Sequence, residues 1–135
     1  MKQKLTYTAI SFALAIALAR AFQDRLDNVP PYFTWIGAVN IISWTFYGLD
    51  KRISELRSLK GWRVPELTLN LLTLTGGILG AWIGRQMFNH KTNLKKHLGM
   101  FVILVLATLI HIFLLIRSFY GPPLQWWPPS SWFAF

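Results

Sequence analysis

Four long apolar runs constrain this chain more than any other feature. They cover residues 5–22, 32–49, 65–88 and 98–116. About 20 apolar residues in an α-helix cross the ~30 Å hydrocarbon core of a bilayer. We therefore expect an all-α integral membrane protein, with four hydrophobic helical segments in a single membrane domain that takes in residues 1–135.

The composition favours a membrane protein over a soluble domain. Of the 135 residues, 53% are hydrophobic and only 14% are charged. Fourteen Lys and Arg against five Asp and Glu give a net charge of +9. Because charge avoids hydrocarbon, the basic side chains belong in the loops, where they favour anionic lipid headgroups as partners. The absence of cysteine excludes disulfides and thiolate chemistry in this chain.

The third run, residues 65–88, is rich in glycine. Pro65 and Glu66 suit a helix start, because proline needs no N–H partner there and glutamate complements the helix dipole. Small residues then recur at about one-turn spacing, at Gly76, Gly77, Gly80, Ala81 and Gly84. This GxxxG spacing clears one helix face for close packing on another helix, which is our interpretation; a surface cleared for a lipid or cofactor is the alternative.

Two topologies of the third run remain open. With four uninterrupted spans and a cytoplasmic N-terminus, Lys and Arg divide eight inside to six outside. If the run bends back at Gly76-Gly77 as a re-entrant hairpin, the division becomes eleven to three, which the positive-inside rule favours. Irregular backbone is costly in lipid, and the glycine spacing suits a continuous helix. We expect four spans and retain the hairpin as the alternative.

Polar side chains inside apolar runs usually bond to a neighbouring helix, and three are candidates here: Asn40, Asn70 and His111. In the four-span arrangement Asn70 and His111 lie at similar depths, so we predict a hydrogen-bonded pair. Aromatic residues at the ends of the second run, including Tyr32 and Trp35, indicate the membrane interface.

Two further segments are expected at the membrane surface. Residues 50–60 read as a short amphipathic helix that lies flat in the headgroup layer. The Pro- and Trp-rich tail, residues 121–135, is too broken by proline to span and is interpreted as an interfacial anchor, with docking on another membrane subunit as the alternative.

Four motifs occur in order with consistent spacing. They are Tyr47-Gly48-x-Asp50-Lys51, Arg63-Val64-Pro65-Glu66, Gly76-Gly77-x-x-Gly80-Ala81, and His90-Lys91-Thr92 with Lys95. In these motifs the chain resembles the domain-of-unknown-function 1294 family of small prokaryotic membrane proteins, over roughly residues 44–98. The resemblance implies a prokaryotic plasma or internal membrane and no known activity. Asn89 stands where the family usually has arginine, which weakens any claim that this segment grips a phosphate.

Two functional hypotheses follow. The first is a non-enzymatic scaffold or accessory subunit, with a membrane-protein partner or a second copy of the chain. The alternative is a membrane-surface enzyme or binding site for a phosphate-bearing lipid. Its candidate residues, which we call the surface cluster, are Asp50, Lys51, Arg63, Glu66, His90, Lys91 and Lys95. A carboxylate, a histidine and several cations are the groups that acid–base chemistry on a phosphate needs.

Other classes have less support. His90 and His97, seven residues apart, match no strong metal-ligand spacing, so we expect no metal and no cofactor. The basic segments lack the interleaved aromatic side chains on which bases stack, which disfavours nucleic-acid binding.

Overall fold

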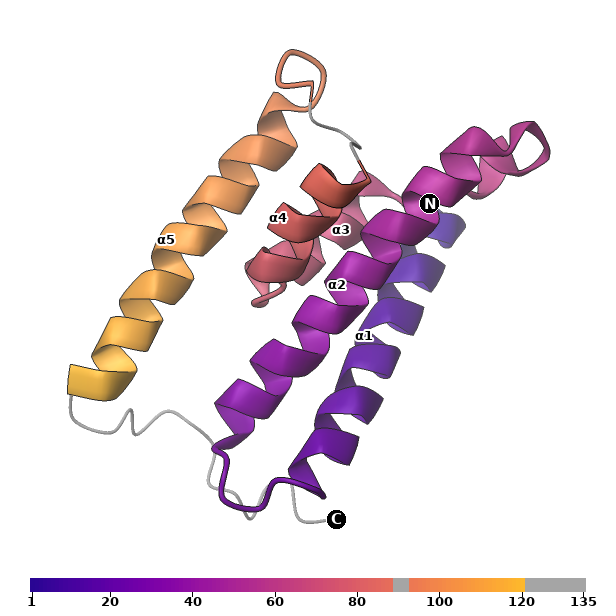
Figure 1. Cartoon of the computed structure of the whole chain (residues 1–135). Helices are drawn as coiled ribbons and strands as arrows, with labels where there is room; N and C mark the ends of the chain where they lie inside the picture. The colour runs from indigo at the N-terminus through magenta and orange to yellow at the C-terminus, as the bar shows by residue number, and fades with distance from the viewer. Residues whose placement is uncertain (89–92, 121–135) are drawn as a thin grey trace.

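The computed structural model describes residues 1–88 and 93–120, and its regular elements in these ranges are all helical. They are α1 (Lys2–Gln23), α2 (Pro31–Glu55), the 3-10 helix η1 (Arg57–Trp62), α3 (Glu66–Leu74), α4 (Ile78–Met87) and α5 (Leu98–Tyr120). The predicted all-α class is confirmed for the described residues. In Figure 1, α1 lies on one side of α2, and α4 lies between α2 and α5, with α3 behind it.

Two helices, α1 and α5, are long and apolar enough to cross a membrane. Both expose apolar side chains to their surroundings, including Leu14 and Ile16 on α1 and Leu109 and Phe113 on α5. Helices that are apolar on most of their surface are typical of membrane segments. By length and hydropathy the described residues therefore hold two candidate spans, whereas we predicted four.

The second apolar run differs from our prediction at its end. We expected a span over residues 32–49 and a separate surface helix over 50–60, but α2 continues unbroken from Pro31 to Glu55. Pro31 occupies the first helical position, where proline is tolerated, and Leu56 ends the helix in an extended conformation. The separate short helix that follows is instead η1, over Arg57–Trp62. α2 is not one of the two candidate spans.

The third apolar run is not one continuous helix, which corrects our expectation of a single span over residues 65–88. It forms α3 and α4, two antiparallel helices that lie side by side and are joined by a bend at Thr75, Gly76 and Gly77 (Figure 1). Gly76 has φ +123°, a conformation that favours glycine. Gly77 N–H donates to the Leu72 carbonyl at 2.8 Å and Gly76 N–H to the Thr73 carbonyl at 3.2 Å, the pattern of a Schellman helix end.

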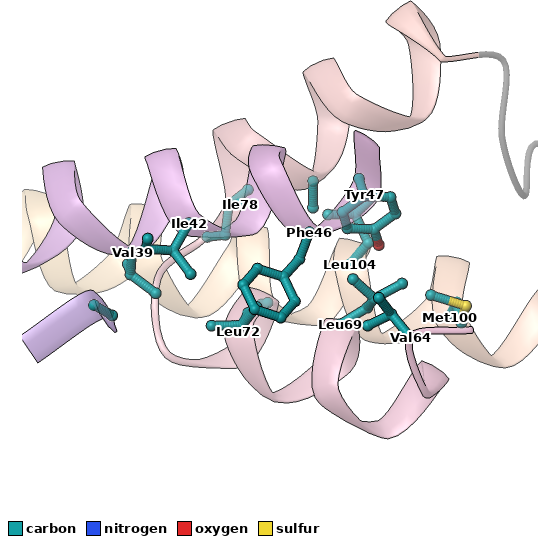
Figure 2. Packing of buried hydrophobic residues seen from close by; sticks show 13 residues of the cluster. Val39, Ile42, Phe46, Tyr47, Val64, Leu69, Leu72, Ile78, Met100 and Leu104 are labelled. Atoms are coloured by element: carbon teal, nitrogen blue, oxygen red, sulfur yellow. The ribbon is translucent and has the colours of Figure 1, made fainter. Parts of the chain in front are cut away.

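The core forms where α2, α3, α4 and α5 meet, as Figure 2 shows. Its side chains include Val39, Phe46, Leu69, Leu72, Ile78 and Leu104. Small residues bring α4 very close to α2: a Cβ on Gly80 would lie 2.1 Å from the Asn40 carbonyl oxygen, and one on Gly84 would lie 2.8 Å from the Tyr47 Cβ. This close approach places the side chains of α2 against the bend between α3 and α4.

Candidate functional site

The bend between α3 and α4 frees backbone carbonyls that a continuous helix would satisfy. Three consecutive carbonyls there accept hydrogen bonds from side chains of other helices. Trp35 Nε1 on α2 donates to the Thr75 oxygen at 2.9 Å, and Asn40 Nδ2 donates to the Gly76 oxygen at 3.0 Å. The Leu74 oxygen lies 3.0 Å from His111 Nε2 on α5. We call these three side chains and the backbone they bind the bend site.

Asn40 connects both sides of the bend. Its Oδ1 accepts a hydrogen bond from the backbone N–H of Gly80, in the first turn of α4, at 2.8 Å. Its Nδ2 binds the Gly76 carbonyl and also its own helix, at the Ile36 carbonyl 2.7 Å away. One side-chain amide therefore accepts from an N–H at the start of α4 and donates to a carbonyl in the bend just before it.

His111 has partners on both ring nitrogens. A carbonyl oxygen can only accept, so Nε2 carries the proton that goes to Leu74, and Nδ1 lies within hydrogen-bonding distance of the Tyr32 hydroxyl, at 3.3 Å. The Asn70–His111 pair that we predicted is wrong: His111 binds the backbone of Leu74, one helical turn beyond Asn70, because α3 ends there and exposes its carbonyl.

Carbonyls 72 through 77 thus all have donors. The Leu72 and Thr73 oxygens accept from Gly77 and Gly76, and the Gly77 oxygen accepts from the N–H of Ala81 at 2.9 Å. The bend site supplies the donors for carbonyls 74, 75 and 76. Pairing of the carbonyls of an irregular backbone suits a non-aqueous environment, where water cannot supply the donors.

The described members of the surface cluster take part in different contacts within the fold. Asp50 is fully buried, and its Oδ1 accepts from the Val64 N–H at 3.1 Å and lies 3.6 Å from Arg63 Nε. These contacts join the end of α2 to the segment that leads into α3. The prediction placed Asp50 at the surface; the continuation of α2 past Leu49 turns this side chain inward instead.

Glu66 shares one partner with Asp50, since both interact electrostatically with Tyr47. Glu66 pairs with His97 at 3.0 Å, which links the start of α3 to the segment before α5. Lys51 pairs along α2 with Glu55 at 3.4 Å, and Lys95 is exposed. His90 and Lys91 lie outside the described residues, as do the tail residues 121–135.

Two side chains of this region have structural roles that we did not predict. Arg85 is buried on α4, with its guanidinium carbon 5.5 Å from the centre of the Phe101 ring on α5, and it interacts electrostatically with Tyr47. The sequence feature that could have indicated a role for Arg85 is its position as an ionisable side chain inside an apolar run. Trp35, which we assigned to the membrane interface, instead binds the bend.

The contacts described above mainly pair charged side chains and cap backbone groups at helix ends. The polar atoms of the bend site are used by one another, and the described residues hold no group of three His, Cys, Asp or Glu that could bind a metal ion.

Comparisons with known proteins give the following. A family described as "Protein of unknown function (DUF1294)" matches residues 40–97, which include most of α2, all of α3 and α4, and the surface cluster. The chain is 33% identical over 88 residues to "Uncharacterized protein YsdA" of Bacillus subtilis (strain 168), a match that covers 62% of this chain and 86% of that protein. No solved structure matches the chain.

Proposed function

This chain belongs to the DUF1294 family of proteins of unknown function, and from that premise we propose that it is a multi-pass membrane protein that serves as a non-enzymatic scaffold or accessory subunit of a membrane complex. In the proposed arrangement the two candidate spans α1 and α5 cross the bilayer. The 25-residue α2, which lies alongside α1, crosses with them, and α3 and α4 form a re-entrant hairpin. The cell membrane that it occupies is a prokaryotic plasma or internal membrane.

The length of the hairpin supports a re-entrant position. With nine residues in α3 and ten in α4, each arm extends about 15 Å at 1.5 Å per residue, roughly half of the hydrocarbon core. A bend at that depth lies in lipid or protein, away from water. The paired carbonyls of the bend site meet the requirement that lipid imposes on irregular backbone.

The charge distribution supports the same arrangement. A hairpin returns the chain to the side from which it entered, so the two basic segments that flank residues 65–88 share one side. Eleven of the fourteen Lys and Arg then lie on that side, and Arg20, Arg25 and Arg117 lie on the other. The positive-inside rule assigns the basic side to the cytoplasm.

The observation that carries the non-enzymatic proposal is the burial of Asp50. A general base needs to reach a proton on its substrate, whereas Asp50 is fully buried and held by Val64 and Arg63. Glu66 is paired with His97. The carboxylates that an acid–base site at the membrane surface would use are therefore part of the joints between helices, and we do not favour the enzyme alternative.

A scaffold or accessory subunit has a membrane partner, which purification can identify. We expect a tagged chain, extracted in mild detergent, to bring down a second membrane protein in a fixed ratio or to form a homo-oligomer of defined size. Substitutions of apolar side chains on one exposed helix face, Leu109→Ala with Phe113→Ala on α5, can be compared with Leu5→Ala and Ile16→Ala on α1 to locate the contact. Recovery of the chain alone, as a monomer, contradicts the proposal.

A further inference from the structure

The six-residue helix η1 exposes apolar and basic side chains on separate faces. A 3-10 helix has about three residues per turn, so side chains three apart lie in line. Leu59 and Trp62 therefore form an apolar ridge, and Arg57 and Lys60 form a cationic ridge beside it. Leu59 is 38% exposed and Trp62 is 64% exposed, and both basic residues are exposed as well. An amphipathic pattern with both ridges exposed indicates contact with something that is both apolar and anionic.

Contacts with two other elements hold η1 in place. Gln3 Nε2 on α1 donates to the Gly61 carbonyl at 2.9 Å, and the Tyr7 hydroxyl donates to the Trp62 carbonyl. Arg63, the next residue, lies against Asp50 at the end of α2. The backbone of η1 is thus fixed to α1 and α2, while its two ridges remain outside these contacts. The exposed Leu59 and Trp62 are therefore held at defined positions.

The neighbourhood of η1 is basic. Its bond to Gln3 brings the first turn of α1, with the exposed Lys2 and Lys4, to the same end of the molecule. Of the acidic residues at this end, Asp50 is buried, Glu55 pairs with Lys51, and Glu66 pairs with His97. The exposed basic side chains here, Lys2, Lys4, Arg57 and Lys60, outnumber the exposed acidic ones, Glu55 and Glu66. The complement of this surface is a dense array of anions.

We propose that η1 docks on the headgroup layer of an anionic phospholipid membrane, with Leu59 and Trp62 at the boundary of headgroups and acyl chains and Arg57 and Lys60 on lipid phosphates. The inference rests on the proposed membrane placement and identifies the element that recognises the lipid. Tryptophan favours this boundary because it combines an apolar ring system with an N–H donor. Each basic side chain near an anionic surface favours docking by about fivefold.

The test uses the full chain in nanodiscs. Because the chain has no cysteine, Leu59→Cys carries a single environment-sensitive fluorophore. Nitroxide-labelled lipids, with the nitroxide near the headgroup end of the acyl chain, report docking by quenching. We expect stronger quenching in phosphatidylcholine with phosphatidylglycerol than in phosphatidylcholine alone. Adding Arg57→Gln and Lys60→Gln should lower the ratio of docked to undocked η1 by about 30-fold in the anionic discs, and raised salt should act in the same direction.

Two controls distinguish an anionic lipid surface from a general charge effect and from a simple anion site. Arg25→Gln with Arg117→Gln removes the same charge at the opposite end of the molecule and should leave the quenching unchanged. Free inorganic phosphate in phosphatidylcholine discs should leave the quenching unchanged. If phosphate raised the quenching as much as phosphatidylglycerol does, η1 would bind single anions and would not recognise a lipid surface. Equal quenching in both lipids, or no quenching in either, overturns the proposal. None of these results changes the outcome of the purification experiment, so the two proposals fail separately.

Discussion

The side-chain oxygen of Asn40 accepts the backbone N–H of Gly80 at 2.8 Å, and the carbonyl oxygen of the same asparagine lies only 2.1 Å from the position that a Cβ on Gly80 would take. The two relationships depend on each other. Without a side chain on Gly80, α4 approaches the α2 backbone closely enough for the asparagine to cap it. Close packing and capping of the bend are therefore one arrangement.

Gly80→Ala should destabilise the protein strongly. The added methyl group would meet backbone atoms of Asn40 and Trp44, which cannot move aside as a side chain can, and overpacking of this kind costs about 1–3 kcal/mol or more. The free energy of unfolding in detergent measures the effect. Gly99→Ala is the matched control, because nothing lies within 4 Å of a Cβ at this α5 position; we expect it to be neutral or slightly stabilising, as alanine favours helix. Equal stability of the two variants would contradict the close contact.

Asn40→Leu should lower the free energy of unfolding because it leaves the Gly76 carbonyl and the Gly80 N–H without their partner. Each unpaired buried group costs about 1–3 kcal/mol. Thr45→Ala, on the same helix, removes only a bond from an exposed hydroxyl to its own helix at Ile41 and should change stability little. Thermal unfolding of both variants in the same detergent checks the prediction. A loss no larger for Asn40→Leu than for Thr45→Ala would show that the cap is dispensable.

His111→Leu should expose the Leu74 carbonyl and release the Tyr32 hydroxyl, at a cost of about 1–3 kcal/mol. His111→Gln retains an N–H donor for Leu74 and should recover part of the loss. Unfolding in detergent and the rate of proteolysis near the bend report the two effects. If the glutamine variant were no more stable than the leucine variant, the bond to the carbonyl would not be the source of the stabilisation.

Asp50→Leu should destabilise more than Asp50→Asn. The asparagine retains an acceptor for the Val64 N–H, whereas the leucine leaves this donor and Arg63 without the carboxylate, and an unpaired buried donor costs about 1–3 kcal/mol. Glu55→Gln removes a carboxylate from an exposed pair with Lys51, which contributes at most about 0.5 kcal/mol. Chemical unfolding of the three variants measures the order. A Glu55→Gln loss as large as that of Asp50→Leu would refute a structural role specific to Asp50.

The sequence predicted what short-range patterns determine. The apolar runs that became α1 and α5 are long and continuous, and the helix class follows from them. The bend at Gly76-Gly77 was identified as an alternative, but local sequence did not decide it, because glycines four apart suit both a packed helix and a hairpin arm. The deciding groups are Trp35, Asn40 and His111, which lie more than 30 residues away along the chain.

The burial of one member of the surface cluster could not be predicted from the sequence either. Asp50 follows an apolar run and precedes Lys51 and Arg52, which in sequence is the pattern of a helix end at the membrane surface. Its burial depends on where α2 ends and on the return of the chain through Val64 and Arg63. These are tertiary contacts, and a hydropathy pattern carries no information about them. Arg85 was visible as a lone charge in an apolar run, but its place against Phe101 was not.

The re-entrant hairpin is the central claim, and the sidedness of the chain before and after it tests this most directly. Ser58 and Asn93 are exposed, and in this cysteine-free chain Ser58→Cys and Asn93→Cys each give one labelling site; Asn28→Cys, in the turn between α1 and α2, marks the other side. A membrane-impermeant maleimide applied to intact cells and to inverted vesicles should label positions 58 and 93 from the same side and position 28 from the opposite side. Labelling of 58 and 93 from opposite sides would mean that residues 65–88 cross the membrane, and the hairpin would be wrong.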